Sequence, residues 1–364
     1  MKICHLTSVH PRYDTRIFYK QCVSLAAQGW AVSLIVADGL GAEVNHGVTI
    51  ADVGKFHGRR QRILKAPQAL YQCVLQLNPQ VVHFHDPELL LIALKLSQRG
   101  FKVIYDVHED VPKQVLNKAW IPRIARPVVA KVMALLEARV ATKLSGIIGA
   151  TDYITQRFLN ANSKSLTIAN YPIVAEFNCN TIPWELRQDR LAYIGSISAT
   201  RGLIPLVDSL ALSQLPLDLA GSYSDSAISV RLKLSPGYPH VVYHGQLRRH
   251  EVSQLLATVK IGVVTLLPTP SYLESLATKT LEYMLAGIPV IASNFPAWQA
   301  MIEGHNCGLM VDPNSATAIA TAAKWLLANP REAQQMGENG RAAVLRHYSW
   351  EVEQQKLLDF YRNL

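Results

Sequence analysis

The sequence predicts two α/β domains of similar size, each built on a doubly wound parallel sheet. Its 364 residues exceed the roughly 250–300 at which a single hydrophobic core stops growing. Strand-like and helix-like segments alternate along most of the chain, which is the pattern of β–α–β units. A stretch at about 160–190 with many Asn and Pro residues interrupts this alternation. Such a stretch is typical of an interdomain connection.

The first half opens with a β–α–β unit, formed by the strand "KICHLTSV", the helical pattern "IFYKQCVSLAAQG" and the strand "AVSLIVADG". The alternation then predicts strands at 81–85, 101–108 and 146–150, and helices at 65–77, 87–98 and 122–145. A second series predicts strands at 191–196, 217–221, 240–245 and 261–267, and ends in helices at 315–328 and 331–346. Ligands of open parallel sheets bind outside the carboxyl ends of the strands, so we expect a site in a cleft between the two domains.

Composition excludes several classes of protein. The chain is 49% hydrophobic and 17% charged, which argues against disorder. The five cysteines are scattered without a CxxC pair, so we expect neither disulfides nor a zinc framework. The start is unlike a signal peptide, and no apolar run is long enough to span a membrane. We therefore expect a cytoplasmic protein that is at most peripheral to a membrane.

Positive charge is concentrated in the first half of the chain. Residues 1–177 carry 21 Lys and Arg against 12 Asp and Glu, a net charge of +9, whereas residues 178–364 carry 15 of each. A basic half favours nucleic acid, anionic lipid or phosphorylated substrates as partners. The alternative is an ordinary basic surface.

The stretch "YLESLATKTLEYMLAGIPVIAS" (272–293) places two acids and a base at helical spacing before a strand. We expect a helix from Ser275 to about Leu285, whose free N–H groups near Ser275 and Leu276 could bind phosphate. Lys279 would add positive charge, and the carboxylates of Glu274 and Glu282 would accept hydrogen bonds from sugar or ribose hydroxyls. The alternative is an ordinary amphipathic helix.

A second cluster, "YIGSISATRGL" (193–203), follows a buried strand in the same half. The strand ends at Gly195, and a loop of small residues leads to Arg201 and Gly202. Small residues let a phosphate approach the backbone, and an arginine can bind it with two hydrogen bonds. The two clusters together predict a nucleotide-diphosphate site, although a plain βα loop with a solvent-exposed arginine is the alternative.

A third cluster lies in the first half, where "HPRYD", "HFHDPE" and "YDVHED" each place histidine and acid at a strand end. These residues come from separate loops without metal-ligand spacing, so we predict no metal site. A rim that binds hydroxyls or moves protons is the preferred interpretation. Structural histidines that cap turns are the alternative. The candidates are His10, Asp14, His85, Asp86, His108 and Glu109.

At this point the sequence resembles the retaining glycosyltransferases of family 4, which have the GT-B fold of two Rossmann-like domains facing across a cleft. The resemblance spans nearly the whole chain. It rests on the Glu-x7-Glu signature Glu274–Glu282, on "ATRG" as a phosphate loop, and on "YDVHED" as the histidine-bearing strand end. "TIANYP" resembles the segment before the second domain, and "YSWEVEQQKLLDFYRNL" resembles a last helix that returns to the first. The domains would be 1–171 with 349–364 for the acceptor, and 172–348 for the nucleotide sugar.

The resemblance implies a role for each matching residue. Glu282 would hold the ribose hydroxyls and Glu274 the sugar hydroxyls of the donor. Arg201 and Lys279 would neutralise the diphosphate, and His108 would contact the donor sugar. Such enzymes require no divalent metal and no cofactor, because the substrate is itself a UDP- or GDP-sugar. Donor-binding residues would therefore be Gly195, Arg201, Gly202, Ser275, Leu276, Lys279 and Glu282.

The sequence departs from the family pattern in two places. Ser196 stands where many relatives have an arginine after the strand glycine, and "SVHPRYDTR" replaces a Gly-Gly loop. We expect Arg16 or Arg12 to compensate from across the cleft. Arg16 is also an acceptor-side candidate, together with His10, Asp14, His85, Asp86 and Glu109. The first loop resembles a bacterial surface-polysaccharide subgroup that extends lipid-linked oligosaccharides, as in O-antigen and lipopolysaccharide biosynthesis.

A lipid-linked acceptor would explain the positive charge of the first half of the chain. The segments "GRRQRILK" (58–65) and "KAWIPRIARPVVAKVMALL" (118–136) mix basic with apolar residues. Both could lie on an anionic membrane surface, and solvated helix faces are the alternative. Two other functions stay open: a nucleotide-sugar epimerase of the same architecture, and a non-catalytic sugar- or nucleic-acid-binding protein. The basic runs lack interleaved aromatic residues, so we expect no nucleic acid.

Overall fold

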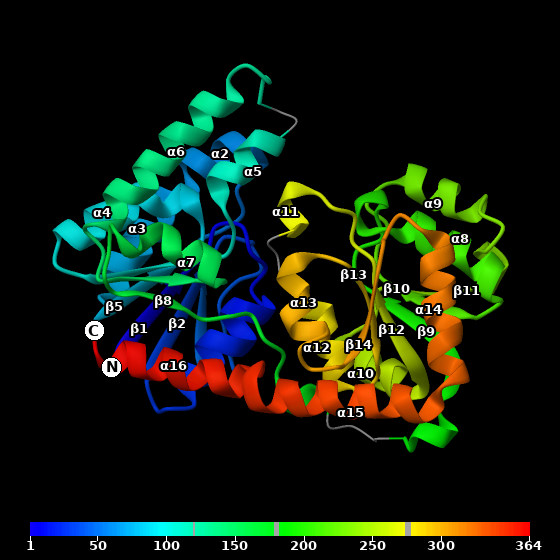
Figure 1. The fold of residues 1–364 in the computed structure, drawn as a ribbon. Coiled ribbons are helices and arrows are strands. Elements are labelled where there is room, and N and C mark those ends of the chain that lie inside the picture. The colour runs from blue at the N-terminus through cyan, green and yellow to red at the C-terminus, as the bar shows by residue number, and fades with distance from the viewer. Residues whose placement is uncertain (119–120, 178–181, 274–277) are drawn as a thin grey trace. The chain divides into compact units, whose positions relative to one another are not determined.

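A computed structural model describes the chain from 1 to 364 apart from residues 119–120, 178–181 and 274–277. The chain divides into two compact units. The first unit comprises Met1–Asn170 with Glu353–Leu364, and the second comprises Tyr171–Val352. Each unit is a parallel sheet with helices on both faces (Figure 1). The predicted fold class of two parallel-sheet α/β domains is confirmed.

The sheet of the first unit has eight strands in the order β3-β4-β2-β1-β5-β6-β7-β8, all parallel except β3 against β4. The strands are β1 Lys2–Leu6, β2 Ala31–Val36, β3 Glu43–Asn45, β4 Val48–Asp52, β5 Val81–Phe84, β6 Lys102–Val107, β7 Gly146–Gly149 and β8 Ser165–Thr167. Sequence patterns did not predict β3, β4 or β8, which are short and at or next to the edges of the sheet. A short half-exposed strand carries too little apolar alternation to be recognised.

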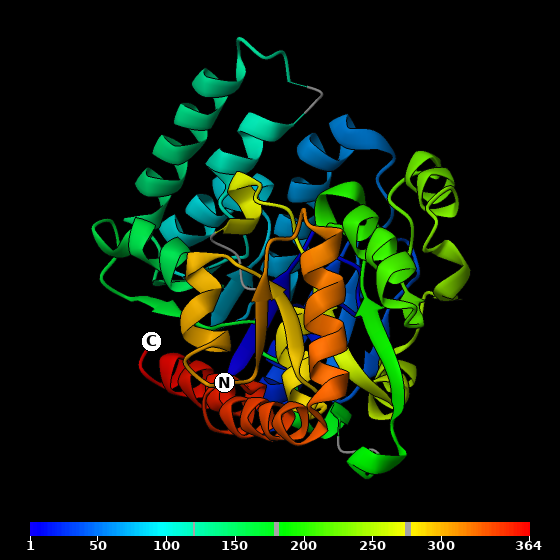
Figure 2. The same ribbon diagram turned by 45° about the vertical axis from the view of Figure 1, so that its right-hand side comes forward.

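Helices of the first unit differ from the sequence predictions at two places. The helix predicted after β1 is a run of π-type turns, η1 Thr15–Cys22, followed by one turn of α1 Val23–Ala26. The helix predicted at 122–145 is shorter, α6 Arg126–Ala141, and begins just before Pro127, a residue that favours helix starts. The remaining helices are α2 Gly58–Leu64, α3 Ala66–Leu77, η2 Pro87–Leu89, α4 Leu90–Gln98, α5 Val111–Asn117, α7 Asp152–Leu159 and, from Glu353 on, α16 Trp350–Arg362. Helices α5 and α6 lie side by side in Figures 1 and 2.

The two faces of this sheet have different chemistry. Alternation along β1 directs Cys4 and Leu6 into an apolar core with side chains of α3, α4, α6 and α7. The neighbouring residue His5 points to the opposite face, where it lies beside His83 of β5 in the parallel register. This face is covered by η1 and α16, and it collects fully buried polar side chains. Strand order reverses between β1 and β5, which is where ligands of such sheets bind.

The sheet of the second unit has six parallel strands in the order β11-β10-β9-β12-β13-β14, so its reversal lies between β9 and β12. The strands are β9 Gln188–Ile194, β10 Leu217–Ala220, β11 Val241–Gly245, β12 Val259–Val264, β13 Val290–Ser293 and β14 Gly308–Val311. Helices α8 and α14 pack together, and so do α12 and α15 (Figure 1). The helices are η3 Val174–Phe177, η4 Trp184–Leu186, η5 Ala199–Arg201, α8 Leu203–Ser213, α9 Ser226–Lys233, η6 Tyr238–His240, α10 Arg249–Thr258, α11 Pro270–Leu273, α12 Thr278–Leu285, α13 Pro296–Ile302, α14 Ala316–Ala328 and α15 Pro330–His347.

A large apolar core holds the second unit together. It takes side chains from both faces of the sheet, including Trp298, Leu206 and Leu326, each nearly or fully excluded from solvent. Within the described part of the chain, no helix has the length and apolar character needed to cross a bilayer.

Candidate functional site

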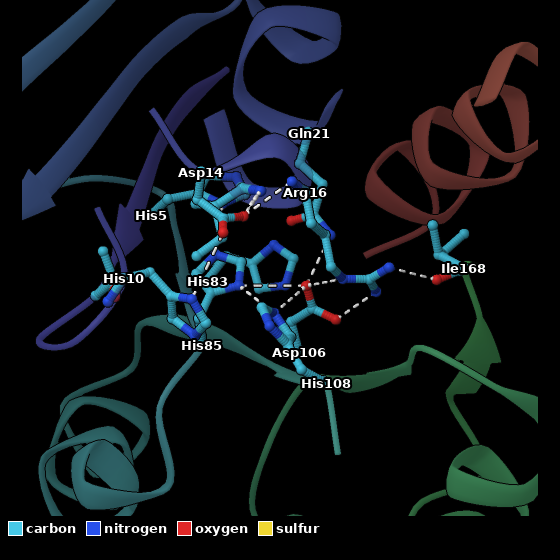
Figure 3. A network of polar contacts seen from close by, with 12 residues as sticks. His5, His10, Asp14, Arg16, Gln21, His83, His85, Asp106, His108 and Ile168 are labelled. Carbon is cyan, nitrogen blue, oxygen red and sulfur yellow. Dashed lines mark hydrogen bonds and ion pairs between the residues drawn. The ribbon is translucent and has the colours of Figure 1, made fainter. Parts of the chain in front are cut away.

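A buried carboxylate organises the polar face of the first unit. Asp106, near the end of β6, is fully buried. Its Oδ1 accepts from Arg16 Nη2 at 2.6 Å, and its Oδ2 accepts from Arg16 Nε at 3.0 Å and Gln21 Nε2 at 2.7 Å (Figure 3). Burial acts to raise the pKa of this carboxyl, but Arg16 and His108 hold the pKa well below its usual value. Asp106 is therefore ionised although no water reaches it.

Two histidines approach the same oxygen of Asp106 from neighbouring strand ends. His108 Nε2 and His85 Nδ1 each lie 3.2 Å from Asp106 Oδ2. Burial is the main cause that lowers the pKa of His85 to about 3, so His85 is neutral. The side chain of His108 keeps 17% of its surface exposed. His108 is thus the member of this group that a ligand can reach.

Further polar residues surround the reversal point of the sheet. Asp86, after β5, accepts from Thr7 Oγ1 at 2.9 Å and from the Ser8 backbone N–H at 2.6 Å. His10 bridges Asp86 and Asp14 at 3.4 and 3.6 Å. Burial opposes the charge of His10, yet Asp14 and Asp86 raise its pKa above the usual value.

The structure brings five of the predicted rim residues together at the carboxyl ends of β1, β5 and β6, and leaves one outside. The five are His10, Asp14, His85, Asp86 and His108. Asp14 also caps η1, because its Oδ1 accepts from the backbone N–H groups of Arg16 and Ile17. Glu109 follows His108 but is exposed.

The predicted compensation by Arg16 or Arg12 meets a physical obstacle. The Arg16 guanidinium is buried, is paired with Asp106, and donates to the Ile168 carbonyl at 2.7 Å. Arg12 is also buried and pairs with Asp38 and Glu43. Releasing Arg16 would strand the buried carboxylate of Asp106, which costs about 3–5 kcal/mol for a buried pair. Releasing Arg12 would break its ion pairs with the part-exposed Asp38 and Glu43. Both arginines are structural in this arrangement.

In the second unit, Lys279 of α12 is buried beside the end of β9. Its Nζ donates to the Tyr193 hydroxyl at 3.0 Å and lies 4.1 Å from the centre of that ring. A Cβ added at Gly195 would lie 2.7 Å from Lys279 Nζ, so glycine leaves room for the ammonium. Burial, followed by repulsion from Arg201, lowers the pKa of Lys279 to about 7, while Glu282 acts in the opposite sense. A cation so poorly solvated is primed to bind an anion.

The loop with Arg201 reaches the neighbouring strand end. Gly202 adopts φ 72° before α8, and a Cβ at this position would lie 1.7 Å from the Thr265 carbonyl oxygen after β12. Only glycine permits this close approach across the reversal point of the sheet. Arg201 lies with its guanidinium carbon 5.9 Å from the centre of the Tyr272 ring. The predicted residues Gly195, Arg201, Gly202 and Lys279 therefore gather at one edge of the sheet.

Glu282, one turn after Lys279 on α12, is held by an ion pair that the sequence did not predict. Its Oε1 accepts from Arg249 Nη1 at 2.7 Å, and Arg249 Nε donates to Glu176 at 3.0 Å. The two carboxylates raise the pKa of Arg249 against the effect of burial. The predicted residues Glu274, Ser275 and Leu276 lie outside the described residues.

Sequence reasoning missed Asp106, Tyr193 and Arg249. Asp106 and Tyr193 belong to the motifs "YDVHED" and "YIGSISATRGL". The alternation of side chains along a strand places Asp106 on the same face as His108. Arg249 carries no comparable signal, because it lies in α10, far from Glu282 in the sequence.

Comparison with known families assigns each half of the chain. Residues 15–168 match the model described as glycosyl transferase 4-like domain, and residues 180–343 match glycosyl transferases group 1. The D-rhamnosyltransferase WbpZ of Pseudomonas aeruginosa is 24% identical over 275 residues, which cover 74% of this chain and 69% of WbpZ. The MMP alpha-(1->4)-mannosyltransferase of Mycolicibacterium hassiacum is 27% identical over 290 residues, covering 73% and 67%.

Solved structures share the fold over the whole chain. Sucrose-phosphate synthase of Thermosynechococcus elongatus has a TM-score of 0.76 at 19% identity, covering 99% of this chain and 98% of that one. WaaG, a glycosyltransferase involved in lipopolysaccharide biosynthesis, has a TM-score of 0.71 at 14% identity, covering 98% of each. HepE of Anabaena, solved with UDP-glucose, has a TM-score of 0.73 at 14% identity and covers 100% of each.

The fold is therefore that of the GT-B glycosyltransferases. With both halves matched by glycosyltransferase models, the chain is a glycosyltransferase of the family 4 type.

Gly202→Ala tests the close approach at the strand ends. The methyl group would overlap the Thr265 carbonyl, so the free energy of unfolding should fall by more than the ~1–2 kcal/mol that a left-handed alanine costs. Gly245→Ala is the matched control, since Gly245 has φ 70° with nothing within 4 Å. Urea unfolding measures both, and equal losses would contradict the steric account.

Lys279→Met tests the buried ammonium. Below pH 7 the folded protein bears the full cost of burying this charge, and the cost is relieved as pH rises from about 7 toward the ordinary value of 10.5. The stability of Lys279→Met relative to wild type should therefore be greatest at low pH. It should then decline by up to about 1.4 kcal/mol per pH unit above 7.

Lys279→Arg is the control, because arginine keeps its charge at every pH. It should lose stability relative to wild type as pH rises. Urea unfolding at roughly pH 6, 8 and 9.5 gives these differences, and a pH-independent difference for Lys279→Met would show that Lys279 is not desolvated.

Proposed function

We propose that this glycosyltransferase moves a sugar from a UDP- or GDP-sugar to a lipid-linked or cell-surface glycan, with retention of the anomeric configuration. The observation that carries the proposal is the buried cation Lys279 beside Arg201 and the glycines at the strand ends of the second unit. A site of this kind suits a diphosphate, because anion binding restores the charge that burial disfavours.

Each group in the second unit has a part in donor binding. Lys279 and Arg201 would neutralise the diphosphate as it leaves, while Gly195 and Gly202 keep side chains away from it. Glu282 would accept hydrogen bonds from the ribose hydroxyls. The ion pair with Arg249 supports this role, because it fixes the Glu282 carboxylate in one orientation. Glu274 would hold sugar hydroxyls, a role that rests on the sequence motif alone.

In the first unit, His108 would contact the donor sugar at the reacting centre. Its exposure, together with the ionised Asp106 behind Nε2, supports this role, since the carboxylate orients the ring. His10, Asp14 and Asp86 would bind acceptor hydroxyls around the same reversal point.

The proposed reaction uses no metal and no cofactor. Cationic side chains stabilise the leaving diphosphate in place of a divalent ion. Two described groups have the composition of a metal site, His5 with His83 and His85, and His85 with Asp106 and His108. Except for His83 Nε2, the buried nitrogens of these groups already engage one another, Asp106 or Tyr361 in hydrogen bonds, which supports a metal-free role.

Known relatives support the donor class. HepE has been solved with UDP and with UDP-glucose. A GDP-mannose-dependent mannosyltransferase of Mycobacterium tuberculosis is 36% identical over 89 residues, which cover 24% of this chain and 23% of that enzyme. Because these donors differ in base, the proposal names the nucleoside-diphosphate sugar as a class.

A lipid-linked acceptor would bring the protein to a membrane surface, and α6 with the turn before it presents a suitable face. Ile124 is 93% exposed, and Val128, Val132 and Leu135 follow at steps of about one helical turn, all exposed. Arg123 and Lys131 are exposed beside them. An apolar stripe with flanking cations suits an anionic lipid surface, and the net charge of +9 in residues 1–177 acts in the same sense.

Two glutamate variants test the proposed donor site. Glu282→Ala should weaken nucleotide binding at least tenfold, because it removes a charged acceptor. Glu274→Ala should abolish transfer while leaving nucleotide binding largely intact. A thermal-shift panel of UDP-, GDP- and ADP-sugars measures binding, since a ligand at 100 times its Kd stabilises the fold by about 2.7 kcal/mol.

Glu303→Ala is the matched control. Glu303 directly follows α13, is exposed, and accepts a hydrogen bond from Gln299. It should behave as wild type. Near-wild-type binding and transfer in both Glu274→Ala and Glu282→Ala would refute the assignment.

Liposome flotation tests the membrane surface. The chain should float with anionic vesicles at low salt and dissociate at high salt, since screening weakens the attraction. The triple variant Ile124→Ser, Val128→Ser, Leu135→Ser should lose binding. The control, Val230→Ser with Leu234→Ser, removes comparably exposed apolar side chains from the second unit and should still bind. Wild-type protein that stays with the unbound fraction at low salt would exclude the proposed surface.

A further inference from the structure

A continuous chain of hydrogen bonds crosses the polar face of the first sheet and ends on α16. His85 Nδ1 lies 3.2 Å from both Asp106 Oδ2 and His108 Nε2, and His85 Nε2 lies 3.0 Å from His5 Nδ1 (Figure 3). His5 Nε2 lies 3.2 Å from the Tyr361 hydroxyl, which lies 2.7 Å from His83 Nδ1. Every member is excluded from solvent, so no water competes for these contacts.

Asp106 fixes the direction of the whole chain. As an ionised carboxylate it can only accept hydrogen bonds. Its Oδ2 receives N–H groups from Arg16 and Gln21, and a bare Nδ1 on His85 would set a lone pair against this anionic oxygen at 3.2 Å. His85 must therefore carry its proton on Nδ1 and donate it to Asp106.

The proton positions of the other members follow in order. Neutral His85 has a bare Nε2, so His5 donates to it from Nδ1–H. His5 then has a bare Nε2, which accepts the Tyr361 O–H. The Tyr361 oxygen in turn accepts from His83 Nδ1–H.

The last atom of the chain provides an independent check. This assignment leaves His83 Nε2 as a bare lone pair. His83 Nε2 is one of the buried atoms for which the described residues offer no hydrogen-bond partner. The opposite direction would place an N–H group there, and a buried donor without an acceptor costs about 1–3 kcal/mol. Both ends of the chain thus specify the same direction.

The same carboxylate determines the tautomer of His108, the exposed member of the group. His108 Nε2 lies 3.2 Å from Asp106 Oδ2, so it donates as Nε2–H and its Nδ1 is left as an acceptor. Asp106 is therefore shared between His108 and the buried chain. A change in the chain of hydrogen bonds therefore alters the contacts of the carboxylate on which the orientation of His108 depends.

We propose that Tyr361, His5 and His85 are positioning residues that act through Asp106 to hold His108 in the Nε2–H form, with Nδ1 free to accept a hydrogen bond from a sugar hydroxyl. The part played by His108 rests on the proposed function. The order of protons in the buried chain does not. The C-terminal helix α16 thereby contributes to the site through one hydroxyl group, that of Tyr361.

Nitrogen-15 NMR of the ligand-free, full-length protein tests the chain without any assay of activity. The protein has 12 histidines, and single His→Gln variants assign their ring signals. His5, His83 and His85 should show the Nδ1–H form, and His108 the Nε2–H form. Any of the three buried rings in the Nε2–H or doubly protonated form would overturn the proposal. A bound-metal pattern on His5, His83 and His85 after addition of Zn²⁺ would also overturn it.

Two variants test direction and coupling. In Asp106→Asn the amide oxygen should take the Oδ2 position, because Arg16 Nε and Gln21 Nε2 donate there. His5, His83 and His85 should then keep the Nδ1–H form, while loss of the charge shifts the ring signals of His85 and His108. Should this variant not fold, Tyr361→Phe keeps the proposal falsifiable. It should shift the ring signals of His85 and His108, and lower kcat for sugar transfer about three- to tenfold with KM for the donor unchanged, as expected for one lost hydrogen bond.

Tyr105→Phe is the matched control. Tyr105 is equally buried in the same unit, but its hydroxyl donates to Glu137 on the other face of the sheet. It should leave the His108 signals and kcat unchanged. Equal effects of the two variants would reduce Tyr361 to a structural role. A correct tautomer pattern in a protein that transfers no sugar would instead refute only the proposed function.

Discussion

The buried pair between Arg16 and Asp106 is the interaction on which the first unit depends. It joins η1 to β6 through two hydrogen bonds, while the Arg16 Nη1 atom binds the Ile168 carbonyl. Losing one partner of a buried pair costs about 3–5 kcal/mol, so the pair holds η1 over the sheet. It also keeps Asp106 ionised, and every proton position from His108 to His83 follows from that charge. The same contact thus supports the fold and determines the chemistry of the site.

In the second unit, the charge of the buried site residue Lys279 is destabilised by its surroundings. Among the residues that the structure describes, no carboxylate forms an ion pair with Lys279. Burial against Tyr193 and repulsion from Arg201 make the charge of Lys279 costly. Glycine at 195 and 202 brings loop backbone to the strand ends where side chains would collide. Arg249, which also pairs with Glu176, holds Glu282 in place. The site is therefore strained electrostatically in a way that a bound diphosphate would relieve.

Alternating patterns predicted the fold class, because long buried parallel strands and helices leave strong signals in sequence. The short strands β3, β4 and β8 and the π-type turns of η1 left none. Motifs selected residues such as Lys279 and His108, which the structure places at strand ends, but their partners came from distant segments. Arg249 reaches Glu282 from α10, and Tyr361 reaches His5 across nearly the whole chain. Such pairings depend on tertiary packing, which no local pattern records.

We propose that the protein transfers a sugar from a nucleotide-sugar donor to a glycan acceptor with retention of the anomeric configuration. The most direct measurement is the anomeric configuration of the product, read by proton NMR after incubation with a UDP- or GDP-sugar and a lipid-linked oligosaccharide. We expect a new glycosidic bond with the configuration of the donor. An inverted product, or turnover of the nucleotide sugar that needs no acceptor, would contradict it.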